Sequence, residues 1–410
     1  MIIMNIKNTL LISKDVLRAD YLSCYGSNIY KTPNIDKLAY NGTIFTRFYT
    51  AAPSSGMAYT AMFSGMDIYQ MNRKYFGNVR QFDQCTTLFQ DLETQGYATH
   101  VIWDKKWYNS SRKKAMVFSN KTMFHNLEIA QHVGPHATYD RDSSGRIIKK
   151  QNVDPISDII GEIIKICKIK GHHFIWLHCP HCFIGCNGYG TDINVFDTLV
   201  GNIISNYEGD IFLTADHGHM NGEKGFYCYG FHVYEGAVHI PLITPNYFNK
   251  NIIDTPYSNI QIKNLILERK LKPQPFIYSD SQYYLQLDRK LMIIKEYFKY
   301  IFNKHSCIEE LYDLAFDPHE NINLLQESVI DKQRLSKYYL DEVFYYSNWN
   351  AAKEAYKLLR KEKERIWRTG TTLGDIAYAI RDIKSNGLKS ISNKFPIKSQ
   401  RGRWGSRIQA

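Results

Sequence analysis

Short apolar runs that stop at polar residues recur along this chain, and they predict buried β-strands. The run of residues 9–13 ends just before Asp15, and the run of residues 211–215 ends at adjacent Asp216 and His217. Short continuous apolar runs are typical of strands that are covered on both faces of a parallel sheet. Because ligands of open α/β sheets bind at the carboxyl ends of the strands, Asp15 and Asp216 are expected to share one site.

Two carboxylates at one buried site require a compensating charge. At about 4 Å and an effective dielectric constant of about 20, they repel each other by roughly 4 kcal/mol, so a proton or a cation must lie between them. Carboxylate and imidazole ligands suit a divalent cation, and we expect one ion of Mn, Ca or Mg, with Zn less favoured. Taken singly, an Asp after a strand is more often a helix cap or a turn residue.

Several further segments, in a fixed order, resemble the sulfatase branch of the alkaline phosphatase superfamily. They are residues 15–20 with Tyr25 and Gly26, and then residues 32–39, 214–218, 233–242 and 310–325. The resemblance implies an α/β fold with a doubly wound, mostly parallel central sheet and a smaller C-terminal α+β subdomain. It also implies a metal-dependent enzyme that cleaves a sulfate or phosphate ester.

The resemblance places Ser55 where sulfatases carry the Cys or Ser that becomes formylglycine. The maturation motif has Pro two residues later and Arg four residues later, whereas this chain has Met57 and Tyr59. We therefore expect Ser55 to stay unmodified and to act as the nucleophile. Without the resemblance, Ser54 or Ser55 would be read as a helix cap.

The resemblance also implies the ligand set of the metal. Val16 stands where many sulfatases have a second metal-binding Asp. Without that Asp, the expected ligands resemble those of relatives that bind a single metal. They are Asp15, Ser55, Asp216 and His217.

Four further residues resemble positions that bind the substrate oxygens in this family. The expected residues are Asn72, Lys106, His181 and His232. Lys105 is the alternative to Lys106. Gly230 stands where the family has its second Lys, and Lys224 is the alternative to His232.

An unmodified serine changes the expected chemistry. A serine ester cannot collapse to an aldehyde, so water or an acceptor alcohol must attack the transferred group. This favours a phosphate ester while leaving a sulfate ester open. Two alternatives remain: a phosphotransferase that moves a phosphate-containing group to a glycan or lipid acceptor, and a degenerate member that binds an anion without turnover.

The cysteines are scattered and do not form a disulfide framework, which favours a reducing compartment. Cys179 and Cys182 have the spacing of a zinc site, but a second such pair is missing, so residues 174–178 are read instead as a core strand in which His178 packs. No run reaches the roughly 20 apolar residues of a membrane span, and the N-terminus lacks a secretion leader. We expect a cytoplasmic protein that is able to lie at the membrane surface.

The patterns divide the chain into three parts. The expected parts are a catalytic α/β domain over residues 1–270, an antiparallel-sheet subdomain over residues 271–345, and a basic, helix-rich tail over residues 346–410. Runs at 278–288, 290–302 and 309–314 predict strands of the small sheet, and apolar residues at 3/4 spacing within 332–368 predict a helix.

Charge is concentrated in the tail. Residues 351–410 contain 15 Lys or Arg and 5 Asp or Glu, a net charge of +10 against +11 for the whole chain. A solvated tail needs no partner, but an anionic membrane, a polyanionic glycan or a partner subunit would also fit this charge. No motif for nucleic-acid recognition is present, so nucleic acid is not expected. The expected substrate is an anionic ester on a glycan or a lipid.

Overall fold

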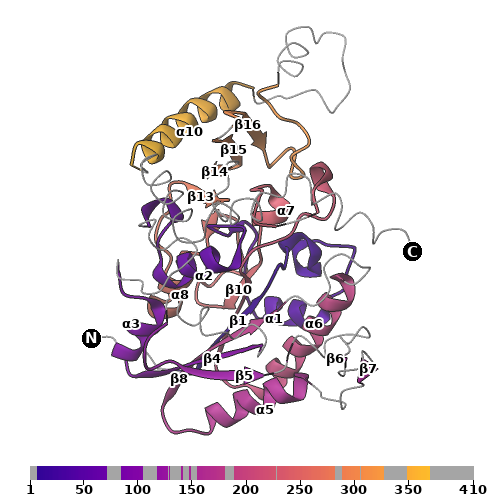
Figure 1. The fold of residues 1–410 in the computed structure, drawn as a ribbon, viewed down its shortest axis with the longest axis vertical. Coiled ribbons are helices and arrows are strands. Elements are labelled where there is room, and N and C mark those ends of the chain that lie inside the picture. Colours follow the sequence, from indigo (N-terminus) through magenta and orange to yellow (C-terminus); the bar gives the residue numbers. More distant parts are fainter. Residues whose placement is uncertain are drawn as a thin grey trace.

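The computed structural model in Figure 1 describes most of the chain, including both sheets and the helices around them. The described residues are 7–71, 85–104, 118–127, 129, 140–141, 147–148, 155–180, 189–227, 229–281, 289–304, 306–326 and 349–369. The N-terminal two thirds contain a large sheet between helices. A small sheet, covered by one long helix, forms the upper part of the view in Figure 1.

The central sheet has eight strands in the order β11-β2-β10-β9-β1-β8-β4-β5. Its strands are β1 (Thr9–Lys14), β2 (Gly42–Phe45), β4 (Tyr97–Asp104), β5 (Met123–Leu127), β8 (His172–Cys179), β9 (Asp210–Ala215), β10 (Leu242–Pro245) and β11 (Ile252–Ile253). The run from β9 through β1, β8 and β4 to β5 is parallel, whereas β10 is antiparallel to β9 and to β2. The predicted fold class, an α/β protein with a mostly parallel sheet, is confirmed.

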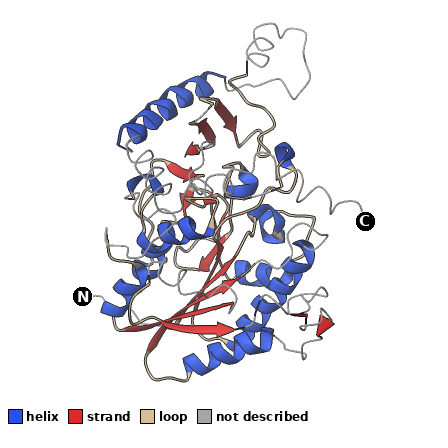
Figure 2. Cartoon of the chain, in the orientation of Figure 1, coloured by secondary structure: helices blue, strands red, loops and turns tan. Residues whose placement is uncertain are grey.

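Helices pack in two groups on either side of this sheet (Figure 2). One group is α1 (Pro33–Tyr40), α5 (Pro155–Cys167) and α6 (Tyr189–Asn206), and the other is α2 (Ser55–Ser64), α3 (Leu88–Thr94) and α8 (Gln261–Glu268). Every residue of β1 is buried, as the continuous apolar run of a two-sided strand predicts. Burial on both faces fixes the strand ends, and therefore fixes the side chains that follow them.

The small sheet is an antiparallel meander whose described strands overlap the predicted runs. Residues 282–288 of the run predicted at 278–288 lie outside the described residues. Its strands are β13 (Ile277–Asp280), β14 (Lys290–Lys295), β15 (Phe298–Asn303) and β16 (Glu309–Asp313). Along β14, Leu291 and Ile293 pack in one apolar cluster, and Met292 and Ile294 pack in another. This alternation shows that both faces of the small sheet are covered.

Helix α10 (Trp349–Thr369) covers one of these faces. Ala352, Leu359 and Ile366 lie one heptad apart, are buried, and join the same cluster as Leu291 and Ile293. The first part of the predicted basic tail is thus packed against the small sheet. The rest of that tail, residues 370–410, and the predicted helical residues 332–348 lie outside the described residues.

Four short strands complete the described structure. They form two-stranded pairs, β3 (Phe48–Tyr49) with β12 (Tyr257–Ser258), and β6 (Asp140–Arg141) with β7 (Ile147–Ile148). The short helix α7 (Glu235–Val238) lies between the two sheets in Figure 1. Among the described helices, none is both long enough and apolar enough to cross a membrane.

Candidate metal centre and nucleophile

Two neighbouring strands deliver the carboxylates of the candidate metal centre. β1 and β9 pair in parallel, with Lys14 opposite Ala215, so Asp15 and Asp216 leave the sheet side by side. Asp15 is 1% exposed and Asp216 is 0% exposed. The structure therefore places both carboxylates in one buried position at the carboxyl edge of the sheet.

His217 presents one ring nitrogen to both carboxylates. Its Nε2 atom lies 3.7 Å from Oδ1 of Asp15 and 3.5 Å from Oδ2 of Asp216. Its Nδ1 atom lies 2.8 Å from the carbonyl oxygen of Gly218, and a carbonyl can only accept a hydrogen bond. Nδ1 therefore donates to this carbonyl, and Nε2 is the ring nitrogen that faces the carboxylates. The ring of Tyr229 stacks on His217 with ring centroids 4.7 Å apart.

Ser55 completes the group from a different element. It is the first residue of α2, and its Oγ atom lies 3.1 Å from Nε2 of His217. The residue before the helix, Ser54, makes no side-chain capping hydrogen bond. The hydroxyl of Ser55 is thus directed at the site, and the helix start offers backbone N–H groups on the same side.

Asp216 accepts hydrogen bonds from the backbone and has a raised pKa. Its Oδ1 atom accepts hydrogen bonds from the backbone N–H groups of Val16, at 3.2 Å, and His217, at 2.8 Å. Burial, together with the charge of Asp15, raises the pKa of Asp216 to about 6, although the neighbouring His217 acts in the opposite direction. Within the described part of the chain, Oδ2 of Asp216 accepts no hydrogen bond. This carboxylate is therefore short of positive charge.

The donor set fits a divalent cation. One ligand atom each from Asp15, His178 and Asp216 lie within 4.8 Å of one another. Nε2 of His217 lies near the same carboxylates, and the hydroxyl of Ser55 lies 3.1 Å from that nitrogen. Oxygen and imidazole ligands of this kind suit Mn, Ca, Mg or Zn. The expected ligands Asp15, Ser55, Asp216 and His217 are thus brought together.

His178 is a candidate ligand that the sequence pattern assigned to the core. It lies on β8 opposite Ser13 of β1, one residue before the strand ends, and is 1% exposed. The rings of Tyr59 and Trp176 meet it edge-on, with centroids 5.5 Å and 5.7 Å away. Its strand-end position was the available signal, since a histidine within an apolar run is otherwise expected to pack.

Tyr59 occupies the position where the maturation motif has its Arg. Its hydroxyl lies 3.0 Å from Oγ of Ser13, which also accepts a hydrogen bond from the indole N–H of Trp176 at 2.8 Å. Burial and the nearby charges of Asp216 and Asp15 raise the pKa of Tyr59, so its phenol stays neutral. A neutral side chain here leaves the two carboxylates without the positive charge that an Arg would supply.

Residues 7–183 match the family model described as Sulfatase. This part of the chain is a sulfatase-family domain. It is 32% identical over 111 residues to arylsulfatase D from Homo sapiens, covering 25% of this chain and 18% of that protein. It is also 32% identical over 105 residues to N-acetylgalactosamine-6-O-sulfatase from Bacteroides thetaiotaomicron, covering 25% and 20%. The matched region spans about a fifth of the length of these curated relatives.

The similarity in fold extends beyond the sulfatase-family domain. The phosphonate monoester hydrolase of Agrobacterium radiobacter superposes with a TM-score of 0.60 at 16% identity, covering 82% of this chain and 94% of that one. Ps i-CgsB, in complex with k-i-k-neocarrahexaose, superposes with a TM-score of 0.60 at 14% identity, covering 92% and 97%. At these identities the likeness shows a shared fold, and the large and small sheets are both part of it.

The residues expected to bind substrate around the sulfatase-family site are only partly described. Asn72, Lys106 and His181 lie outside the described residues. His232 is 8% exposed and stacks on Phe226, with ring centroids 3.7 Å apart. Its described contacts are thus with aromatic rings beside α7.

Lys224, the alternative to His232, turns towards the small sheet. Its ammonium donates a hydrogen bond to the carbonyl oxygen of Glu320 and lies 5.0 Å from the ring centroid of Tyr312. Gly230 adopts φ 83°, a conformation that favours glycine over lysine. Gly230 therefore supplies no cation at the position of the family's second Lys. Lys224 donates its described hydrogen bond beside the small sheet.

Proposed function

We propose that this chain is a metal-dependent hydrolase that cleaves a sulfate or phosphate ester through a covalent intermediate on Ser55. One observation carries the proposal: Ser55 Oγ lies 3.1 Å from His217 Nε2, which also faces Asp15 and Asp216. A hydroxyl at a helix start beside two buried carboxylates has little use as a cap. It has the position that a nucleophile needs.

The residues of this chain would divide the work as follows. A divalent ion held by Asp15, Asp216, His217 and Ser55 would neutralise the carboxylates and ease the loss of the Ser55 proton. Oγ of Ser55 forms a bond to the phosphorus or sulfur atom while the bond to the departing alcohol breaks. The proton lost by Ser55 balances the one that the departing alcohol gains. The first N–H groups of α2 stabilise the charge on the transferred group.

Release of the group requires a second displacement. Water attacks the phosphorus or sulfur atom, the bond to Oγ breaks, and Ser55 recovers its proton. An unmodified serine cannot eject the group by forming an aldehyde, so this step decides between substrates. Phosphoryl groups tolerate such a double displacement well, which is why we place phosphate esters beside sulfate esters. Two phosphonate monoester hydrolases among the structural neighbours support this choice.

The ester is proposed to sit on a glycan or a lipid. Ps i-CgsB, which shares the fold, was crystallised with a neocarrahexaose, and this supports a glycan carrier. We further propose that the protein acts in the cytoplasm and that its basic C-terminal residues hold it near an anionic membrane or polyanion.

A turnover screen tests the proposal directly. The full chain would be assayed against aryl sulfates, aryl phosphates and phosphodiesters, with Mn, Ca, Mg or Zn added after chelation. Hydrolysis of at least one class that depends on the added metal is the expected result. Transfer of the group to an added alcohol in preference to water would make the chain a transferase. Absence of turnover, with a metal bound, would make it an anion-binding member.

A pair of neighbouring serines separates catalysis from helix capping. Ser55→Ala should lower turnover by several orders of magnitude while leaving the metal bound, and acid quench of the unaltered protein should trap phosphate or sulfate on Ser55. Ser54→Ala is the matched control and should stay within a few fold of normal. Near-normal activity of Ser55→Ala would exclude the covalent step. A formylglycine mass at position 55 would exclude an unmodified nucleophile.

A further inference from the structure

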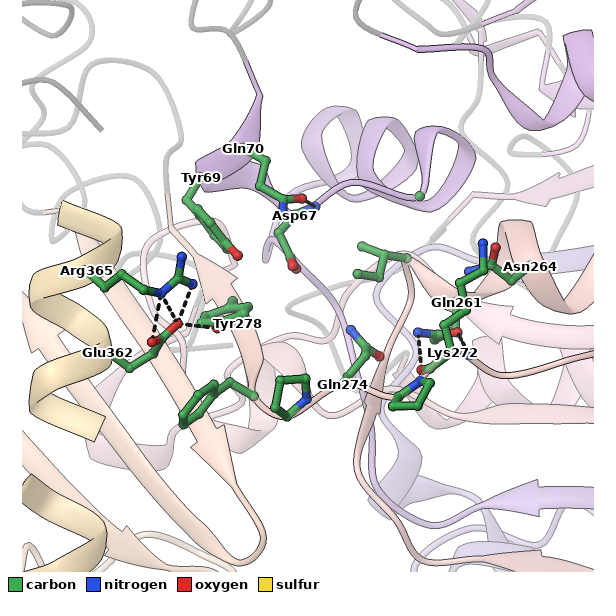
Figure 3. Close-up of a pocket in the computed structure, with 15 residues that line it drawn as sticks. Asp67, Tyr69, Gln70, Gln261, Asn264, Lys272, Gln274, Tyr278, Glu362 and Arg365 are labelled. Carbon is green, nitrogen blue, oxygen red and sulfur yellow. Dashed lines mark hydrogen bonds and ion pairs between the residues drawn. The ribbon is translucent and has the colours of Figure 1, made fainter. Parts of the chain in front are cut away.

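A second cavity lies at the other end of α2 from Ser55 (Figure 3). Its volume is about 470 Å³, within the range of small-molecule sites. Gly65, which ends α2, lines it together with residues of α8, β13, α10 and the loop before β13. Because an α-helix rises about 1.5 Å per residue, the ten residues of α2 separate this cavity from Ser55 by roughly 15 Å. It is therefore distinct from the metal centre.

Asp67 forms a capping box with Gln70 and presents one unsatisfied carboxylate oxygen to this cavity. The residue is 6% exposed, and its Oδ1 atom is buried without a hydrogen-bond partner among the described residues. Figure 3 shows the carboxylate pointing into the space between Tyr278 and Gln274. Burial raises the pKa of Asp67 to about 7. A buried oxygen of this kind is costly unless a donor reaches it, so a donor is expected from within the cavity.

The other charged side chains of the wall are already paired. Glu362 on α10 forms an ion pair with Arg365 and accepts a hydrogen bond from the hydroxyl of Tyr278 at 2.6 Å. Gln261 exchanges hydrogen bonds with the backbone of Lys272, at 2.8 Å and 2.9 Å. The paired charges cancel and the amide is engaged. The ammonium of Lys272, at the edge of the cavity, lies 3.7 Å from Oε1 of Glu268. Among the described residues, Asp67 is therefore the lining carboxylate that still has an unpartnered oxygen, and a sulfate or phosphate group placed beside that oxygen would be repelled.

Aromatic rings give the cavity apolar surfaces beside this acceptor. Tyr69 and Tyr278 meet edge to face with centroids 4.9 Å apart, and Phe276 lies 6.3 Å from Tyr278. A sugar ring combines hydroxyl donors at its edge with C–H groups on its faces, so it can satisfy a carboxylate and pack on aromatic rings together. A lone ammonium would satisfy Asp67 but would leave most of the volume unfilled.

We propose that this cavity binds a sugar unit without an ester group, either a neutral hexose or an amino sugar, through hydrogen bonds to Asp67. The sugar hydroxyls or its ammonium group donate to Oδ1 of Asp67, and the rings of Tyr69, Phe276 and Tyr278 contact its apolar face. The site does not depend on hydrolysis at Ser55. It would hold a glycan at a second point, away from any bond that is cleaved.

Calorimetric titration of the full chain tests this site. The probes are glucose, galactose, glucosamine and N-acetylgalactosamine, with ethylamine as a donor that is not a sugar. At least one sugar should bind in the millimolar range or more tightly. At pH 8, where Asp67 is ionised, Asp67→Asn should weaken that binding at least about tenfold, because it removes the charged acceptor while keeping the shape.

Three further variants sharpen the result. Glu354→Gln removes an exposed carboxylate from α10, the helix that carries Glu362, and should leave sugar binding unchanged. Asn264→Phe fills the cavity without altering Asp67, so it should abolish sugar binding even if Asp67→Asn fails to fold. Ser55→Ala should bind the sugars normally, which separates this site from the proposed hydrolase activity.

Three results would overturn the proposal. The first is failure of every sugar to bind, and the second is sugar binding that survives both Asp67→Asn and Asn264→Phe. The third is equal binding of ethylamine and the sugars, since Asp67 would then be a simple cation site. Unchanged turnover of a small aryl ester in Asp67→Asn would confirm that the loss of binding is not a loss of the metal centre.

Discussion

At the scale of single residues, the backbone of Val16 shows how the metal centre is held. Val16 adopts φ 59°, which is uncommon for a β-branched residue and costs on the order of 1–3 kcal/mol. In this conformation its N–H group donates to Oδ1 of Asp216, 3.2 Å away. The same position carries a second metal-binding Asp in many sulfatases. Here the backbone of Val16, and not its side chain, contributes to the site by orienting Asp216.

The two adjacent carboxylates favour metal binding but destabilise the fold when no metal is bound. Asp15→Asn should abolish metal retention, because one neutral amide and one carboxylate bind a divalent ion much less tightly. The same variant, without metal, should melt at a higher temperature by a few degrees, because it removes one of two adjacent buried charges. Elemental analysis and thermal unfolding measure the two effects.

Asp158→Asn is the control for both measurements, since Asp158 is exposed on α5. It should retain the metal and melt normally. Full metal occupancy in Asp15→Asn would contradict the assigned ligand set.

Sequence alone predicted part of the site at this scale. Asp15 and Asp216 follow apolar runs, so their position at strand ends could be read directly. His178 lies one residue before the end of β8, so its strand-end position was the one signal, and a histidine within an apolar run is otherwise expected to pack. The orphaned oxygen of Asp67 had no sequence signal, because it results from packing between α2, α8 and α10.

At the scale of elements, the presence of a strand or helix was easier to predict than the direction of a strand or the burial of a helix. The run predicted at 309–314 corresponds to β16, and residues 290–302 fold as the hairpin of β14 and β15. The start of the run predicted at 278–288 overlaps β13, and residues 282–288 lie outside the described residues. The antiparallel direction of β10 was not predicted, because a four-residue apolar run carries no information about its neighbours. The packing of α10 against the small sheet was also not predicted. Its many charged residues suggested a solvated helix and obscured the three apolar residues spaced seven apart.

A line of histidines crosses three strands of the central sheet. His100 on β4 lies 3.1 Å from His125 on β5 and 3.0 Å from His173 on β8, measured between ring nitrogens. Nδ1 of His125 lies 2.8 Å from Oε1 of Glu162 on α5. Burial, with the neighbouring His125 and His173, lowers the pKa of His100 to about 4. His100 is therefore neutral in the folded sheet.

This line predicts acid sensitivity. The unfolded chain takes up a proton at His100 near pH 6.5, whereas the folded chain takes it up only near pH 4. Stability should therefore be full above pH 6.5 and should fall by up to about 3 kcal/mol as the pH drops to 4. His100→Gln should flatten that part of the pH profile of urea unfolding. His319→Gln, at an exposed position, should not. An unchanged profile in His100→Gln would assign the acid sensitivity to other groups.

At the scale of the whole molecule, the basic C-terminal region divides into two parts. Helix α10 is tied to the small sheet, since the hydroxyl of Tyr356 donates to Glu309 and the ammonium of Lys363 lies 4.2 Å from the ring centroid of Phe302. Truncation within this helix would expose the apolar face of the small sheet.

Deletion of residues 370–410 tests what the remaining basic residues do. Turnover of a small soluble ester should stay within a few fold of normal, because the deletion removes neither the nucleophile nor any proposed metal ligand. Binding to vesicles of anionic lipid should weaken, and the residual binding should depend less on salt. Neutral vesicles are the control. Complete loss of small-ester turnover in a folded, truncated protein would show that these residues contribute to the site itself.

One buried cation, Lys299, links the small sheet to α7. Lys299 on β15 is 0% exposed, and its ammonium lies 2.8 Å from carboxylate oxygens of both Glu235 on α7 and Glu320. These carboxylates raise the pKa of Lys299 against the effect of burial. Glu320 also accepts the backbone N–H of Glu235 at 2.7 Å, which fixes the start of α7 to the small sheet. The lysine therefore compensates two acids that hold the parts of the molecule together.

Lys299→Met should destabilise the protein by about 3–5 kcal/mol at pH 8, because it leaves two buried carboxylates without a cation. Burial already raises the pKa of Glu320 to about 7, and removing Lys299 raises it further. A carboxyl with a raised folded pKa stabilises the fold at low pH and loses that contribution as the pH rises. The loss should therefore be smaller at pH 5 than at pH 8, and adding Glu320→Gln should recover part of it. Lys353→Met, on the exposed face of α10, should change urea unfolding little. An equal loss at both pH values would mean that Lys299 contributes through packing and not through its charge.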